Sequence, residues 1–154
     1  MMFTIKSNDG WQTIQFIQKQ KIELQDKVFF LFQLYLKADF WNREEMLKDE
    51  FNELKTDKVV KYEQLCISNE KWNVFLEKIE NWKNNRELFT FDLYNEVGDF
   101  ITVKLDDSSD ELMASSEKPI LSIIIKDSRT KFEFNMLIDN TSFSQASEVS
   151  PAQV

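Results

Sequence analysis

The sequence predicts an α+β fold in which a mainly antiparallel sheet carries about two amphipathic helices packed on one face. Three observations support this prediction. Most of the chain alternates apolar and polar residues or carries short β-rich runs, two segments show helical periodicity, and the last four strand-like segments follow one another as a meander. With 154 residues, 42% of them hydrophobic and 14 of them Phe, the chain can bury one aromatic-rich core in a single domain.

The first half of the chain contains four strand-like segments. Residues 28–36 and 59–67 are rich in β-branched and aromatic residues, and weaker signals of the same kind cover residues 3–6 and 13–17. We expect a strand in each of these four segments.

Two segments predict amphipathic helices. In residues 42–54, Asn42 can cap the first turn and Glu45 can complete a capping box. The second helix follows Ser68 and Asn69, and its apolar residues recur on one face of a helix. The two apolar stripes consist of Met46, Leu47, Phe51 and Leu54 in the first helix and of Trp72, Phe75, Leu76, Ile79 and Trp82 in the second.

The second half of the chain predicts two β-hairpins. Residues 89–93 and 100–105 flank a turn signal at Gly98, and residues 120–125 pair with residues 132–138 through a polar connection. In both hairpins apolar residues alternate with polar ones, so one face of each is expected to be buried.

The end of the chain predicts a disordered tail. Residues 142–154 contain Ser, Gln, Ala and Pro151, with little apolar content after Phe143. The predicted globular domain therefore covers residues 1–141.

Composition excludes most catalytic chemistry. The chain has no histidine, one cysteine and two glycines, so it cannot form a Ser-His-Asp or Cys-His site, a Cys/His metal site or a glycine-rich phosphate loop. Cys66 has no second cysteine to pair with and no histidine to activate it, which predicts a buried structural thiol. We expect a protein without enzymatic activity, cofactor or metal.

The charge of the chain is acidic and unevenly distributed. Residues 86–154 hold 13 acidic and 6 basic residues, whereas residues 1–85 hold 14 acidic and 13 basic residues. Such a charge repels nucleic acid and anionic membranes and favours a basic partner. The N-terminus shows no signal peptide, and the longest apolar run, residues 28–32, is far shorter than the roughly 20 residues of a membrane span, so we expect a cytoplasmic protein.

The densest acidic segment joins the two predicted hairpins and contains Asp106, Asp107, Asp110 and Glu111. Three interpretations are open: a solvated loop, a docking surface for a basic partner, and a divalent-cation site. The last fits poorly, because an EF-hand loop needs a central glycine that this segment lacks.

A second acidic group surrounds Tyr94 at the turn of the first hairpin and consists of Asp92, Glu96 and Asp99. Paired carboxylates can perform general acid–base chemistry when one of them is desolvated, but they also occur at solvated hairpin ends. An exposed Tyr94 beside these acids would instead suit a protein interface, where aromatic anchors are ringed by complementary charge.

Phe40 and Trp41 lie at a predicted junction of strand and helix. They are expected to seal a corner of the core or to form an exposed anchor. Trp72 and Trp82 lie on the apolar stripe of the second helix and are predicted to be core residues.

The order of elements over residues 28–138 resembles small bacterial immunity proteins, the cytoplasmic antidotes of polymorphic and contact-dependent growth inhibition toxins. The likeness consists of a strand ending in residues 38–42, a strand over residues 59–65, a helix over residues 72–79, and a strand over residues 88–91 followed by hairpins. This pattern is similar to the WapI-like immunity family, whose members are α+β. The family has no catalytic residues to transfer, and its binding residues vary with the toxin.

The resemblance implies a cognate protein toxin with a basic surface, such as a nuclease domain, that is neutralised by one-to-one occlusion. The charge of the chain agrees with such a partner. We expect a monomer or weak dimer that binds neither nucleic acid nor membrane. The residues expected to contact the toxin are Asp106, Asp107, Asp110, Glu111, Glu96, Asp99 and Tyr94.

Other classes of function stay open at this stage. A small-ligand-binding module or a carboxylate enzyme would need an enclosed pocket with inward-facing acids. An adaptor or anti-defence protein that mimics nucleic acid would spread its carboxylates along one elongated face, and a structural subunit would associate through an apolar patch.

Overall fold

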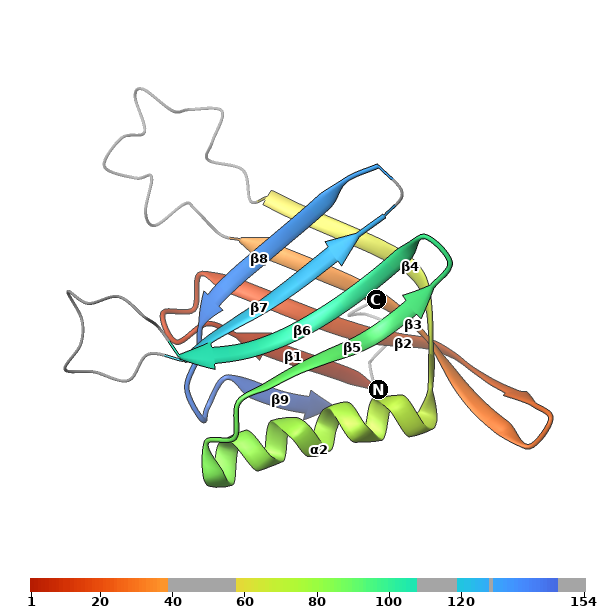
Figure 1. Cartoon of the computed structure of the whole chain (residues 1–154), viewed down its shortest axis with the longest axis horizontal. Helices are drawn as coiled ribbons and strands as arrows, with labels where there is room; N and C mark the ends of the chain where they lie inside the picture. Colours follow the sequence, from red (N-terminus) through yellow and green to blue (C-terminus); the bar gives the residue numbers. More distant parts are fainter. Residues whose placement is uncertain (39–57, 108–118, 128, 147–154) are drawn as a thin grey trace.

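The computed structural model describes residues 1–38, 58–107, 119–127 and 129–146, and this part of the chain forms nine strands and one helix (Figure 1). All of the predicted strands are present, and the predicted hairpins at Gly98 and before Lys131 are confirmed. The elements are β1 Met2–Lys6, β2 Gln12–Leu24, β3 Lys27–Ala38, β4 Lys58–Ser68, α2 Asn69–Asn85, β5 Phe89–Glu96, β6 Asp99–Asp107, β7 Pro119–Lys126, β8 Lys131–Leu137 and β9 Phe143–Ala146.

The strands form two sheets. One has the order β4-β3-β2-β1-β9 and the other the order β5-β6-β7-β8, and every pairing between neighbours is antiparallel. The mainly antiparallel α+β class is therefore confirmed, whereas the prediction of one sheet is wrong. The chain enters α2 directly after β4 and then starts a new sheet at β5, and each sheet buries its apolar face against the other and the helix. The helix predicted over residues 42–54 lies outside the described residues.

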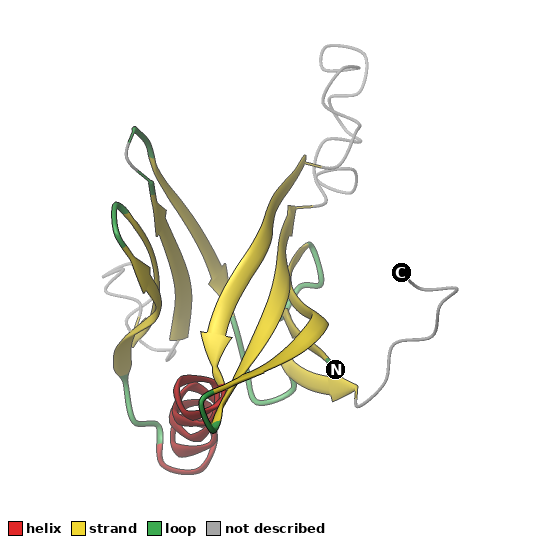
Figure 2. Ribbon diagram, turned by 90° about the vertical axis from the view of Figure 1, so that its right-hand side faces the viewer, coloured by secondary structure: helices red, strands yellow, loops and turns green. Residues whose placement is uncertain are grey.

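Helix α2 lies where the two sheets approach each other most closely, and the sheets diverge away from it (Figure 2). Ser68 caps its first turn, because the hydroxyl oxygen accepts a hydrogen bond from the backbone N–H of Lys71 at 3.2 Å. The helix ends at Arg86, which has a left-handed backbone conformation (φ 58°) and donates its backbone N–H to the carbonyl of Trp82. Among the described residues no helix is both long and apolar enough to cross a membrane.

The apolar stripe of α2 joins the inner faces of both sheets. Its buried residues are Trp72, Phe75, Ile79 and Trp82, as the periodicity predicts. The Trp72 ring centroid lies 4.6 Å from that of Phe32 and 5.3 Å from that of Phe16, both in the first sheet. Phe75 stacks on Phe91 of the second sheet at 6.4 Å. The predicted aromatic core is thus a cluster centred on the helix.

The edge of β8 is attached to the first sheet. The backbone N–H of Asn8 donates to the carbonyl of Leu137 at 2.9 Å, and the side-chain amide of Gln12 donates to the carbonyl of Asn135 at 2.6 Å. These hydrogen bonds give a partner to two carbonyl groups of β8, which is an edge strand of the second sheet.

The prediction that a disordered tail begins at residue 142 is wrong, because residues 143–146 form β9. This strand pairs with β1, with Met2 opposite Ala146, and the Phe143 ring lies 6.3 Å from Phe3 and 6.0 Å from Trp82. Four residues, of which only Phe143 favours a strand, give little strand signal of their own, and the free edge of β1 provides their partner. Residues 147–154 lie outside the described residues.

The prediction of a buried thiol is also wrong, because Cys66 is exposed. Its neighbours Leu65 and Ile67 are 5% and 1% exposed and point to the core. Since side chains alternate along a strand, the residue between them faces solvent. Trp72 and Trp82 are confirmed as core residues, and Phe40 and Trp41 lie outside the described residues.

Candidate binding site

The residues predicted to contact a partner do not form one patch. Glu96 and Asp99 flank the β5–β6 turn, whereas Asp106 and Asp107 end β6. Asp99 and Asp107 are eight residues apart in one extended strand, which separates them by about 26 Å at about 3.3 Å per residue. Figure 1 shows the turn and the end of β6 at opposite ends of the second sheet. Asp110 and Glu111 lie outside the described residues.

The turn end of β6 borders a cavity of about 110 Å³ between the two sheets, which we call the tyrosine cleft. It brings Tyr94, Asp99 and the neighbouring β6 residues against β4 and against the end of β7. Its lining residues are Tyr62, Glu63, Gln64, Leu65, Tyr94, Asp99, Phe100, Ile101, Ile125, Lys126 and Asp127.

A β-bulge directs Tyr94 toward this cleft. Asp92 pairs with Thr102 and Tyr94 with Ile101, so Leu93 is an extra residue in β5. Residues directly opposite in an antiparallel pair point to the same face, and Ile101 is only 2% exposed. Tyr94 is therefore half-buried against the core. Strict alternation after Phe91 would have placed it on the outer face instead.

A second irregularity places Tyr62. In β4, Tyr62 pairs with Leu34 and Leu65 pairs with Phe32, so two intervening residues oppose one residue of β3. Gln64 in this bulge has left-handed backbone (φ 63°). Tyr62 and Leu65 consequently both face inward, although they are three residues apart. Tyr62 was not predicted as a site residue, because its position in the cleft depends on this bulge.

Two phenols and nearby carboxylates determine the electrostatics of the cleft. Burial raises the pKa of Tyr62, and the charges of Asp127 and Asp99 raise it further. Burial also raises the pKa of Tyr94, with smaller contributions from Glu96, Asp99 and Cys66. Both phenols are therefore neutral at physiological pH and lie near carboxylate side chains. An aromatic cavity with this charge suits a cationic group.

Asp127 is fixed by the turn between β7 and β8. Its carboxylate accepts the backbone N–H groups of Arg129 at 2.8 Å and Thr130 at 2.7 Å, and these hydrogen bonds lower its pKa. Asp127 thus remains negatively charged over the whole neutral and mildly acidic range.

Replacing Asp127 by Asn is expected to destabilise the protein more at pH 7 than at about pH 3. A lowered folded pKa means that the carboxylate stabilises the fold above the ordinary Asp pKa of about 3.9, and that this contribution disappears as the pH falls through the folded value. Urea unfolding of both proteins at pH 7 and at about pH 3 measures the difference. Glu133→Gln, on β8 of the same hairpin, is the charge-matched control. A stability difference independent of pH would contradict this role of the charge.

The positive groups near the cleft have other contacts. Lys61 pairs with Glu63 at 2.9 Å, and its Nζ lies 5.5 Å from the centre of the Tyr35 ring. The Nζ of Lys126 lies 5.5 Å from the centre of the Phe100 ring. Asp99 and Asp127 form no ion pair within 4.0 Å with any lysine or arginine of the described residues.

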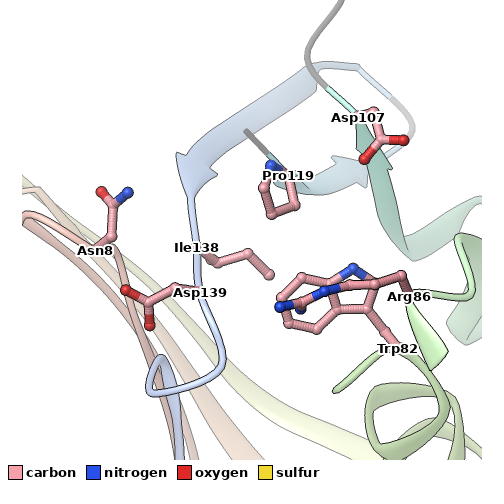
Figure 3. A pocket seen from close by; sticks show the side chains of 7 residues that line it. All are labelled: Asn8, Trp82, Arg86, Asp107, Pro119, Ile138 and Asp139. Atoms are coloured by element: carbon pink, nitrogen blue, oxygen red, sulfur yellow. The ribbon is translucent and has the colours of Figure 1, made fainter. Parts of the chain in front are cut away.

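The far end of β6 has a different character. Asp107 lines a cavity of about 270 Å³ together with Arg86, Trp82, Asp139 and three further residues (Figure 3). The guanidinium carbon of Arg86 lies 4.5 Å from the centre of the Trp82 ring, and its Nη1 donates to the side chain of Asn140 at 2.6 Å. Asp106 is paired with Lys104 at 3.4 Å. A basic partner would meet a fixed arginine here, so this end is the weaker candidate for it.

The carboxylates considered for acid–base chemistry are exposed. Asp92 accepts a hydrogen bond from the Thr102 hydroxyl at 2.8 Å on the outer face of the sheet, and Asp99 lies at the rim of the tyrosine cleft. Neither has the desolvated environment that makes one carboxyl group of a pair an acid at neutral pH. Within the described part of the chain, no three acidic or cysteine side chains lie close enough together to hold a metal ion.

Comparison of the chain with family models, with curated proteins and with solved structures gives no match.

Proposed function

We propose that this protein is an immunity protein, which binds a cognate toxin with a basic, nuclease-type surface and neutralises it by one-to-one occlusion. The resemblance over residues 28–138 and the formal net charge of −8 support the proposal. The β5–β6 hairpin, residues 89–107, contributes five acidic residues and a single lysine. Such a surface attracts a basic partner and accelerates its association.

The observation that carries the proposal is the tyrosine cleft, where Tyr62 and Tyr94 are bordered by Asp99 and Asp127. Tight interfaces concentrate their binding energy in aromatic anchors within desolvated pockets, surrounded by complementary charge. Glu96, which follows Tyr94 in the same strand, adds to this charge.

The distance along β6 assigns different roles to the predicted acids. Charges are screened over about 8 to 10 Å at physiological ionic strength, which is much less than the roughly 26 Å between Asp99 and Asp107. In the proposed complex Tyr94, Glu96 and Asp99 contact the toxin together with Tyr62 and Asp127. Asp106 and Asp107 contribute only to the overall electrostatic field of the protein.

The test is a pull-down with tagged protein from host lysate that includes the product of the gene immediately upstream, followed by an inhibition assay on the captured protein. We expect a basic partner in a 1:1 complex, as measured by analytical ultracentrifugation, whose activity is lost on binding. Affinity should fall at least about tenfold between 50 and 300 mM salt, as for charge-steered association. A captured protein that keeps its activity in the saturated complex would contradict the proposal.

One observation favours a second candidate, a small-ligand-binding module. The cavity at Arg86 has about 270 Å³, close to the lower limit of ligand pockets, and its guanidinium group is held in place by Trp82 and Asn140. Native mass spectrometry of the purified chain distinguishes the two functions. A retained small molecule that is lost in Arg86→Ala would favour the ligand-binding module.

A further inference from the structure

The tyrosine cleft has the size of one side chain. Its volume of about 110 Å³ is well below the roughly 300 Å³ at which pockets for cofactors and drug-sized ligands begin. A protein partner could fill it with a single residue that extends from its own surface.

The walls of the cleft are mainly aromatic and apolar. Tyr62 and Tyr94 are half-buried, and Leu65 and Ile101 behind them are 5% and 2% exposed. Burial is the main cause of the raised pKa of both tyrosines, so the two phenol groups are partly withdrawn from water.

The charge at the rim is negative. Asp99 belongs to the β5–β6 turn and Asp127 to the β7–β8 turn, so carboxylates from two separate turns border the same cavity. The lysine that also lines it, Lys126, lies against the Phe100 ring.

We propose that the tyrosine cleft binds the guanidinium group of one arginine side chain of the partner, an inference that rests on the proposed function for its biological role. The planar guanidinium group can stack on a phenol ring and donate to a carboxylate at the same time. It is also more weakly hydrated than an ammonium group, so it loses less on entering an aromatic cavity. Lysine is therefore expected to bind more weakly than arginine at this site.

The chain offers its own reporters for a test. It contains three tyrosines, of which Tyr62 and Tyr94 line the cleft, while Tyr35 contacts Lys61 on the outer face of the first sheet. Incorporation of 3-fluorotyrosine gives three ¹⁹F signals, which Tyr→Phe variants assign. The full-length protein is titrated at about pH 6.5, where the phenols are protonated, with acetyl-Gly-Arg-Gly-amide and with the lysine and glutamine analogues.

The arginine peptide is expected to shift the Tyr62 and Tyr94 signals saturably and to leave the Tyr35 signal in place. The lysine peptide should bind at least about threefold more weakly, and the glutamine peptide should cause no saturable shift. Asp99→Asn should weaken the arginine peptide about fivefold, whereas Asp106→Asn at the far end of β6 should leave its binding unchanged.

Equal shifts with arginine and lysine, or no saturable shift of Tyr62 and Tyr94 with arginine, would overturn the inference. Because the peptides contain no toxin, this result would leave the proposed function to be decided by the inhibition assay. Conversely, if the protein binds the arginine peptide selectively but inhibits no partner, the arginine site is supported and the proposed function is contradicted.

Discussion

Replacing Trp72 by Ala is expected to lower the free energy of unfolding by about 3 to 5 kcal/mol, the usual loss for a large buried aromatic residue. Trp72 is 2% exposed, and its ring contacts Phe3, Phe16 and Phe32 of the first sheet and Phe75 of α2. Removing it leaves a cavity where the helix attaches to the sheet. Urea denaturation monitored by circular dichroism measures the loss.

Two further variants make this prediction specific. Trp72→Phe should cost much less than Trp72→Ala, because it keeps a ring in the cluster and removes an indole N–H that is buried without a hydrogen-bond partner in the structure. Val74→Ala changes a residue on the same helix that is 40% exposed, and it should cost less than about 0.5 kcal/mol. Equal losses for Trp72→Ala and Val74→Ala would show that the aromatic cluster does not hold the helix in place.

The double charge reversal Glu96→Lys and Asp99→Lys is expected to weaken binding of the proposed toxin about 100-fold, or about 2.7 kcal/mol. It places two positive charges beside Tyr94 where the basic partner must approach. Most of the loss of affinity should come from slower association. The affinity of the variant should also depend less on salt, since the association rate and the salt dependence both report electrostatic attraction. Surface plasmon resonance at two salt concentrations measures both quantities.

The chain contains a matched control at the other end of the same strand. Asp106→Lys combined with Asp107→Lys changes the net charge by the same amount, about 26 Å away by the rise of an extended strand. We expect this double variant to weaken toxin binding less than about fivefold, because ionic screening limits its effect to the overall electrostatic field of the protein. Equal losses for the two pairs would show that only total charge matters and that the tyrosine cleft is not the contact surface.

The local sequence pattern was sufficient to predict the described helix and every described strand except β9. Alternation of apolar and polar residues identified the strands, and the spacing of Trp72, Phe75, Ile79 and Trp82 identified the buried face of α2. These patterns are local because side-chain direction repeats every two residues in a strand and every 3.6 in a helix. The acidic composition likewise predicts a basic partner, and this stays a prediction.

The grouping of residues into a site depended on tertiary structure. The extra residue at Leu93 and the left-handed Gln64 turn Tyr94 and Tyr62 toward one cleft, and no local pattern marked either bulge. The same limit applies to β9, since this four-residue segment forms a strand by pairing with the edge of β1. The extended β6 likewise holds Asp99 and Asp107 apart, although both were expected to contact one toxin. Periodicity along the chain is thus set by each residue's own backbone, whereas strand partners, bulges and the distances between charges are set by contacts between distant segments.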